Sequence, residues 1–72
     1  MMNNIEIKTE FIKLGELLKF SGTAITGGEA KDLITNGEVL VNSDVCTMRG
    51  KKIIAGDIVS VRSKTFSIIK KI

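Results

Sequence analysis

The stretch GGEAKDLITNGEVLVN, residues Gly27–Asn42, decides the fold of this chain. Its first half places apolar residues at i, i+3 and i+4 (Ala30, Leu33 and Ile34), which predicts a short amphipathic helix over about 28–36. The glycine that follows stands where a left-handed residue commonly ends a helix, and the residues after it have the character of a strand. The segment therefore predicts a helix, a glycine stop and a strand in that order.

The sequence on either side predicts the remaining elements. Before the central segment we expect a strand over 4–8, a helix over 10–20 with Thr9 as N-cap and Ser21-Gly22 as stop, and a loop over 23–28. Gly15 weakens the first half of this helix by up to about 1 kcal/mol relative to alanine, which favours a later start. Beyond the helix we expect strands over 38–41, 44–46, 52–54, 58–62 and 65–72, with turns at Asn42-Ser43 and at Ala55-Gly56-Asp57. The fold class is α+β: two short helices packed on one face of a small, mainly antiparallel sheet of four to five strands.

The composition excludes most catalytic chemistry. The 72 residues are enough for a single domain over 1–72, and they include no histidine and one cysteine. Disulfides, zinc sites and histidine-activated nucleophiles are therefore excluded. We expect no catalytic residue, no metal, no cofactor and no small-molecule substrate, and hence a protein that is not an enzyme.

The chain also lacks sequence signals for export. MMNNIEIKTE at the N-terminus has neither the charged nor the apolar part of a signal peptide, and no apolar run approaches the roughly 18 residues of a membrane span. With one free thiol, a reducing cytoplasm is expected. Cys46 is interpreted as a small apolar residue in a strand.

Charge is distributed unevenly along the chain. The net charge is +3, but residues 1–48 carry −3 and residues 49–72 carry +6. Such asymmetry points to one basic face, although cationic edge strands that resist aggregation are an alternative for Lys70 and Lys71.

Two features point to an anionic partner. RGKK (Arg49–Lys52) places three cations around a glycine at the tip of an expected hairpin loop between two strands, and such a cluster attracts phosphates. Thr26-Gly27-Gly28 precedes a helix, where backbone N–H groups attract anions and glycines leave room for a ligand. Lys31 is expected to point away from the sheet, and Lys19 lies at the end of the first helix. A purely structural role stays open for both features: a solvated turn, and a turn that only starts the helix.

Two further side-chain types bear on recognition. Asn42 can accept a positive φ in a turn or hydrogen-bond a base edge or ribose hydroxyl, and the two roles are compatible. Phe11, Phe20 and Phe66 occupy periodic apolar positions and are expected in the core. Without exposed rings, the chain is poorly equipped to stack single-stranded bases, so charge and shape would carry recognition.

The order of LLK, GGEAK, LI–NGEV–VN, a basic loop and GDIV resembles the alpha-L RNA-binding motif. This S-four domain is named after the fourth protein of the small ribosomal subunit, and the resemblance, over about 12–61, is greatest to stand-alone bacterial proteins of the YaaA/YbcJ type. It implies non-catalytic binding of structured RNA, ribosomal RNA first and tRNA second, with ribosomal subunits or assembly intermediates as partners and a role in ribosome assembly or translation. The binding positions carried over by match are Lys19, Thr26, Gly27, Gly28, Lys31, Asn42, Arg49, Lys51 and Lys52.

The chain departs from the family pattern in two places. It has Asn42-Ser43 where the family commonly has Asn-Gly, and Gly27-Gly28 where many relatives carry Ser-Arg. The phosphate contact of that arginine must therefore come from Lys31 or from the 49–52 loop.

Other function classes remain open at this stage. A protein–protein adaptor would use the acidic and basic halves separately. A β-grasp sulfur carrier shares weak likenesses but needs a C-terminal Gly-Gly, whereas this chain ends in KKI. DNA binding is disfavoured because the second helix is only about nine residues long.

Overall fold

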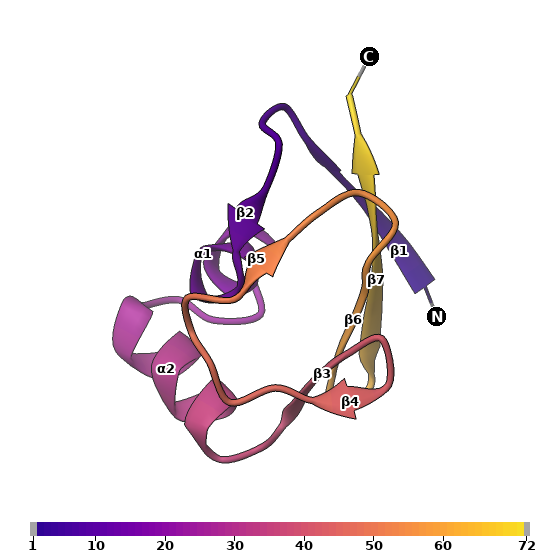
Figure 1. Ribbon diagram of the computed structural model, residues 1–72. Helices are drawn as coiled ribbons and strands as arrows, with labels where there is room; N and C mark the ends of the chain where they lie inside the picture. Colours follow the sequence, from indigo (N-terminus) through magenta and orange to yellow (C-terminus); the bar gives the residue numbers. More distant parts are fainter. Residues whose placement is uncertain (1, 72) are drawn as a thin grey trace.

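The computed structural model describes residues 2–71 and confirms the α+β class (Figure 1). The two helices are α1 (Leu14–Phe20) and α2 (Gly27–Thr35). The strands are β1 (Met2–Ile7), β2 (Ile12–Lys13), β3 (Val39–Val41), β4 (Asp44–Val45), β5 (Lys52–Ile53), β6 (Ile58–Val61) and β7 (Lys64–Lys70). The predicted end of the last strand at Ile72 lies outside the described residues.

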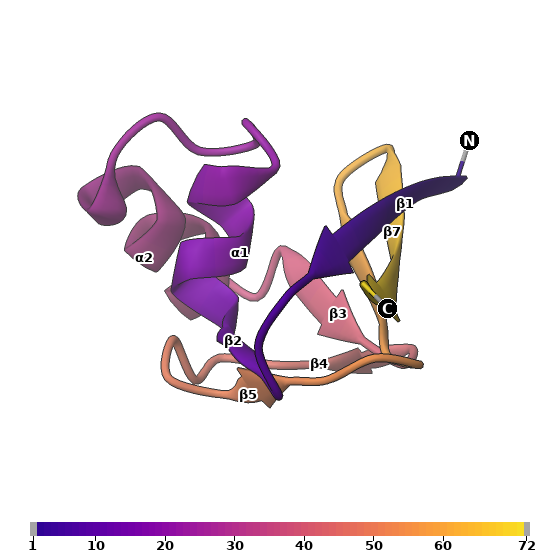
Figure 2. The ribbon, with the colours of Figure 1, turned by 90° about the horizontal axis from the view of Figure 1, so that it is seen from above.

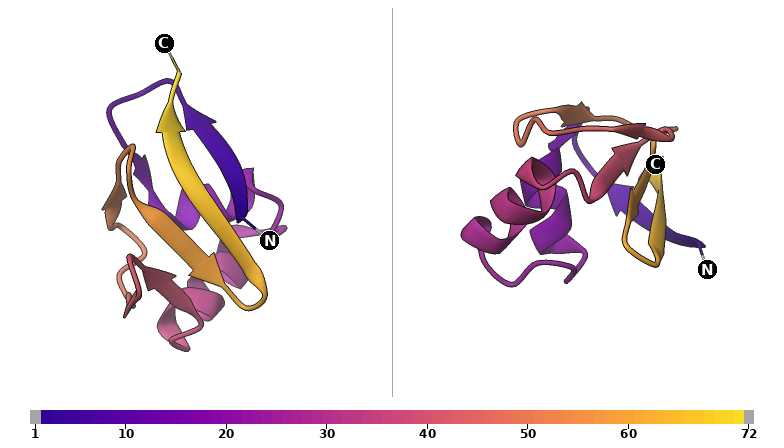
Figure 3. Two further views of the ribbon diagram at one scale, coloured as in Figure 1. Left: turned by 90° about the vertical axis from the view of Figure 1, so that its right-hand side faces the viewer. Right: turned by 90° about the horizontal axis from the view of Figure 1, so that it is seen from below.

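The strands form one larger and one smaller sheet. The larger sheet has five strands in the order β1-β7-β6-β3-β4, and all its pairings are antiparallel except that of β1 with β7. This parallel pair brings the first and last strands of the chain side by side (Figure 3). The second sheet, β2 with β5, was not expected from the sequence. The expected mainly antiparallel sheet of four to five strands is confirmed.

The core lies between the helices and one face of the larger sheet. In Figure 2, α1 lies between α2 and the strands. Sixteen apolar side chains are buried there, and they are Ile5, Ile7, Leu14, Leu17, Leu18, Ala24, Ala30, Leu33, Ile34, Val39, Val41, Ile53, Val59, Val61, Phe66 and Ile68. Because the strands alternate, the residues between these core positions face solvent on the other side of the sheet.

Helix α1 begins later than predicted. Its first residue is Leu14, because Ile12 and Lys13 extend to pair with β5. Thr9 is not an N-cap; its hydroxyl donates instead to the carbonyl oxygen of Phe11 at 2.7 Å. The predicted stop is confirmed, since Gly22 follows the helix with a φ of +80°.

The predicted turns around β3 are confirmed. Gly37 ends α2 with a φ of +77°, and Asn42 and Ser43 join β3 to β4 with φ values of 52° and 75°. Positive φ at both central residues is the geometry that matches the twist of a two-residue hairpin. Asn42 thus fills the turn role expected of it.

Two of the three phenylalanines are not in the core. Phe66 is buried as predicted, but Phe11 is 37% exposed and Phe20 is 66% exposed. Phe11 misses the core because it precedes β2 rather than lying on a helix, and Phe20 because it ends α1 beyond the buried stripe. Cys46 was predicted to lie in a strand, but it directly follows the end of β4 at Val45; it packs partly buried against the core.

A search of residues 2–71 for a helix both long and apolar enough to cross a bilayer finds none.

Candidate nucleic-acid interface

A groove of about 410 Å³ runs between the two helices and the loop that precedes β5. We refer to it as the α1–α2 groove. It is lined by Lys13, Gly15, Glu16, Lys19, Gly27, Ala30, Arg49 and Gly50. Three residues predicted to bind, Lys19, Gly27 and Arg49, are therefore brought together although they lie far apart in the sequence.

The backbone of the basic loop is held against the start of α1. The amide of Leu14 donates to the carbonyl oxygen of Lys51 at 2.9 Å, and the amide of Gly15 donates to that of Arg49 at 3.0 Å. These bonds satisfy donors that a helix N-terminus otherwise leaves free. A turn closed by the Lys51 amide and the Met48 carbonyl oxygen at 3.1 Å fixes the loop from its other side.

Gly15 allows the side chain of Arg49 to lie directly over α1. A Cβ at position 15 would stand 2.8 Å from Cγ of Arg49 and 3.4 Å from its Cδ. Carbon atoms pack best about 3.5–4.0 Å apart, so only glycine permits this arrangement without a shift. The glycine therefore positions the arginine beside the groove.

The N-terminus of α2 presents free backbone donors at the opposite wall. Thr26 is the N-cap, and its hydroxyl accepts from the amide of Glu29 at 3.1 Å. Within residues 2–71, the amides of Gly27 and Gly28 have no hydrogen-bond partner. Gly27 is exposed, and a Cβ built there would meet nothing within 4 Å.

The charge around the groove is mostly positive. Lys13, Lys19 and Arg49 are exposed cations in its lining, and Glu16 is the acidic residue among them. Lys31 does not line the groove; it lies one turn along α2 from Gly27, on the same side of the helix. This combination of free amides and cations is suited to phosphate oxygens.

The other predicted residues lie elsewhere. Asn42 and Lys51 border a second hollow of about 410 Å³ beside β4. Both ends of the Asn42 amide are engaged inside the protein: Nδ2 donates to Oδ1 of Asp57 at 3.0 Å, and Oδ1 accepts from the amide of Ile58 at 2.9 Å. Lys52 holds its ammonium 4.8 Å from the centre of the Phe11 ring.

The prediction that the basic loop is the tip of a hairpin is wrong. Strand β4 pairs with β3 and β5 pairs with β2, so the loop crosses from the larger sheet to the smaller one. This crossing brings Lys13, Gly15 and Gly50 into the groove, and none of them was among the residues predicted to bind. Because the helix was predicted to begin at residue 10, Lys13 and Gly15 were placed inside it. Only the weak helix propensity of Gly15 indicated a later start.

The family assignment rests on comparison with known proteins. The S4 domain profile matches residues 5–69, which is nearly the whole described chain. This chain belongs to the S4 domain family. The S4 domain is the RNA-binding domain that the sequence resemblance indicated, so that identification and the expectation of a non-catalytic protein are confirmed. The β-grasp sulfur-carrier alternative is wrong.

Two known proteins are similar to this chain over most of its length. It is 43% identical over 61 residues to the Bacillus subtilis (strain 168) protein named probable ribosome maturation protein RlbA, covering 85% of this chain and 86% of that one. It is also similar to the solution structure of YbcJ from E. coli, with a TM-score of 0.68 and 31% identity over 94% of this chain and 85% of that one. The YbcJ structure is described as revealing an alpha-L motif involved in RNA binding.

Proposed function

We propose that this S4 domain binds structured RNA by placing the phosphate backbone in the α1–α2 groove. The observation that carries the proposal is the convergence of Gly27, Lys19 and Arg49 on one groove. The amides of Gly27 and Gly28 can donate to one phosphate, because no side chain of their own shields them. Arg49 can fork onto the oxygens of the same or a neighbouring phosphate.

The remaining cations extend this contact. Lys13 and Lys19 line the groove on the α1 side, and Lys31 lies one turn further along α2. They also offset Glu16, whose carboxylate opposes an anion in the same groove. Thr26 acts by capping α2 and so fixing the direction of the two free amides.

Lys51 and Lys52 are proposed as peripheral contacts. Both are exposed, but Lys51 faces the second hollow and Lys52 covers Phe11. The amide of Asn42 is already hydrogen-bonded to Asp57 and Ile58, so we assign Asn42 to the turn rather than to a base.

We propose ribosomal RNA as the target, within ribosomal subunits or their assembly intermediates in the cytoplasm, with tRNA as the second candidate. The name of the 43% identical relative, a probable ribosome maturation protein, favours this choice. Shape also favours it, since a folded RNA offers phosphates and ribose hydroxyls across an accessible minor groove.

Salt-dependent binding of an RNA hairpin, followed by fluorescence anisotropy, tests the proposal. Three to five neutralised phosphates give a slope of log affinity against log salt of about −2 to −5. Arg49→Ala should weaken binding and flatten the slope. Gly27→Ala should weaken binding without lowering stability, because its new methyl group meets only the open groove. Lys64→Ala, which removes an exposed cation outside the groove, is the matched control.

The cellular target is tested by crosslinking the protein to RNA and sequencing the recovered fragments. Ribosomal RNA should dominate, and Arg49→Ala should deplete it. Binding that ignores both Arg49 and Gly27 would contradict the groove assignment, and recovery of mainly tRNA would contradict the ribosomal target.

A further inference from the structure

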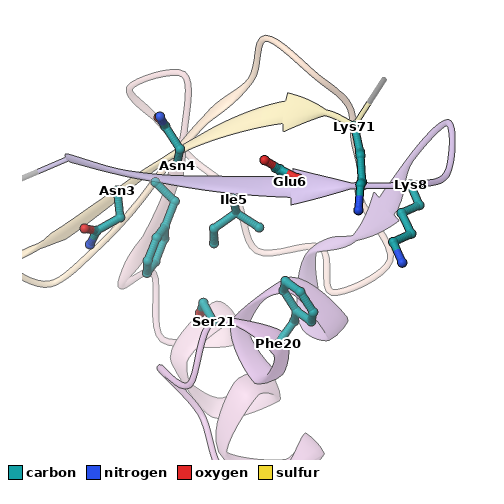
Figure 4. Close-up of a pocket in the computed structure, with 9 residues that line it drawn as sticks. Asn3, Asn4, Ile5, Glu6, Lys8, Phe20, Ser21 and Lys71 are labelled. Carbon is teal, nitrogen blue, oxygen red and sulfur yellow. The ribbon is translucent and has the colours of Figure 1, made fainter.

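We propose that the exposed ring of Phe20 is the base-stacking platform of a second RNA site, which takes an unpaired nucleotide beside the groove. The inference rests on the proposed RNA-binding function and adds to it a contact with single-stranded RNA. A hollow of about 460 Å³ lies between β1 and the end of α1, and we refer to it as the β1–α1 hollow (Figure 4). Phe20 lines it while remaining 66% exposed, so much of this aromatic residue is accessible to a ligand.

The chemistry of the hollow suits a nucleotide. Figure 4 shows the Phe20 ring facing β1, with Lys8 and Lys71 at the same end of the hollow and Asn3 at the other. An aromatic face stacks any base, lysines neutralise its phosphate, and an amide offers both a donor and an acceptor to a base edge. Glu6 also borders the hollow, but its side chain leaves β1 on the face away from Phe20 (Figure 4).

The hollow adjoins the surface already proposed to bind RNA. Lys19 lines the α1–α2 groove and Phe20 lines the β1–α1 hollow, and the two are consecutive residues of α1. Their Cα atoms are about 3.8 Å apart, whereas successive helical side chains diverge by about 100°. A strand of RNA leaving the groove therefore reaches Phe20 by passing over the last turn of α1. Charge and this continuity favour an RNA nucleotide over a peptide added to the edge of β1.

The test compares two RNAs: a blunt hairpin, and the same hairpin with a short single-stranded oligoadenylate extension. The natural chain should bind the extended RNA more tightly, because one stacked base contributes a factor of about 5 to 150. Phe20→Leu should lose that increment while binding the blunt hairpin unchanged, and Phe20→Trp should retain it. Phe11→Leu is the control, because the Phe11 ring is covered by Lys52. Thermal unfolding should show that each variant is folded, as the exposure of Phe20 leads us to expect.

The outcomes separate this inference from the proposed function. Arg49→Ala should weaken binding of both RNAs equally, whereas Phe20→Leu should weaken binding of only the extended RNA. If the natural chain binds both RNAs but gains nothing from the extension, or if Phe20→Leu keeps the gain, the second site is wrong and the groove stands. If the natural chain binds neither RNA, both proposals fail. A photocrosslinking phenylalanine analogue at position 20 should capture RNA in cells; capture of protein alone would overturn the inference in favour of a peptide site.

Discussion

Replacing Gly15 by alanine should have opposite consequences for stability depending on whether Arg49 is present. Glycine costs a helix up to about 1 kcal/mol relative to alanine, so the substitution alone would be stabilising. In the natural chain, however, the new Cβ would stand 2.8 Å from Cγ of Arg49, about 1 Å closer than carbon atoms pack. The arginine must rotate away and lose its packing over α1.

The two effects can be separated by a double-mutant cycle. With Arg49 present, the gain in helix propensity is offset, and we expect the free energy of unfolding to stay unchanged or to fall. In an Arg49→Ala background nothing obstructs the methyl group, because the next atom it meets is the backbone oxygen of residue 49 at an ordinary 3.6 Å. There Gly15→Ala should stabilise by up to about 1 kcal/mol, giving a coupling energy of about 0.5 kcal/mol or more.

Urea unfolding followed by circular dichroism measures these differences, and RNA affinity gives a second readout. Gly15→Ala should lower hairpin affinity by about tenfold, as Arg49→Ala does, since a hydrogen bond to a charged group contributes about 1.5 kcal/mol or more. The double variant Gly15→Ala, Arg49→Ala should lose no more RNA affinity than Arg49→Ala alone.

Gly28→Ala provides a matched control for stability. Gly28 is also the second residue of its helix, but a Cβ there would meet only the hydroxyl of Thr26, at 3.9 Å. It should therefore change stability equally in both backgrounds. Equal effects of Gly15→Ala in the two backgrounds would refute the idea that this glycine positions the arginine.

Three further predictions concern a turn and an ion pair outside the groove. Ser43→Gly should stabilise the chain by about 0.5–1 kcal/mol in urea unfolding, since a φ of 75° strains a residue with a Cβ. Asn42→Ala should destabilise it by about 2 kcal/mol, because two side-chain hydrogen bonds are lost at a positive φ; an unchanged urea midpoint would contradict this. The hydrogen bond and charge of Lys70 lower the pKa of Glu10. This exposed pair therefore stabilises the fold slightly at pH values above the ordinary pKa of Glu10, and that stabilisation is lost as the pH falls through the lowered pKa. Lys70→Met should return the pKa of Glu10 toward its usual value in an NMR titration, and an unshifted titration would show that the pair does not form.

Elements set by neighbouring residues were predictable from the sequence. Helix α2 carries its own cap in Thr26, its own apolar stripe and its own stop at Gly37, so it begins and ends within about one residue of the prediction. The turn at Asn42 and Ser43 is equally local. Helix α2 supplies one wall of the α1–α2 groove, and that wall was predicted.

The other wall depends on a contact between distant segments. Phe11, Leu14, Leu17 and Leu18 have helical spacing, and only the weak helix propensity of Gly15 argues against a helix from residue 10. Helix α1 begins only at Leu14 because the residues before it form β2, which pairs with β5 about forty residues further along the chain. The same pairing draws the basic loop onto α1. One unforeseen ladder therefore accounts for the misplaced start of α1, the hairpin that does not form and the unrecognised Lys13.

The burial of Phe20 was misjudged for a different reason, and this error bears on function. Successive helical residues turn by about 100°, which places Phe20 beyond the edge of the stripe formed by Leu14, Leu17 and Leu18. Its position in a periodic apolar pattern predicted a buried ring, and on that basis stacking of single-stranded bases was disfavoured. The chain has few aromatic residues, but it is their exposure that decides whether they can stack on bases. With Phe20 at the surface beside Lys19, charge and stacking are adjacent on α1, and an RNA held by its backbone would also present an unpaired base to the ring.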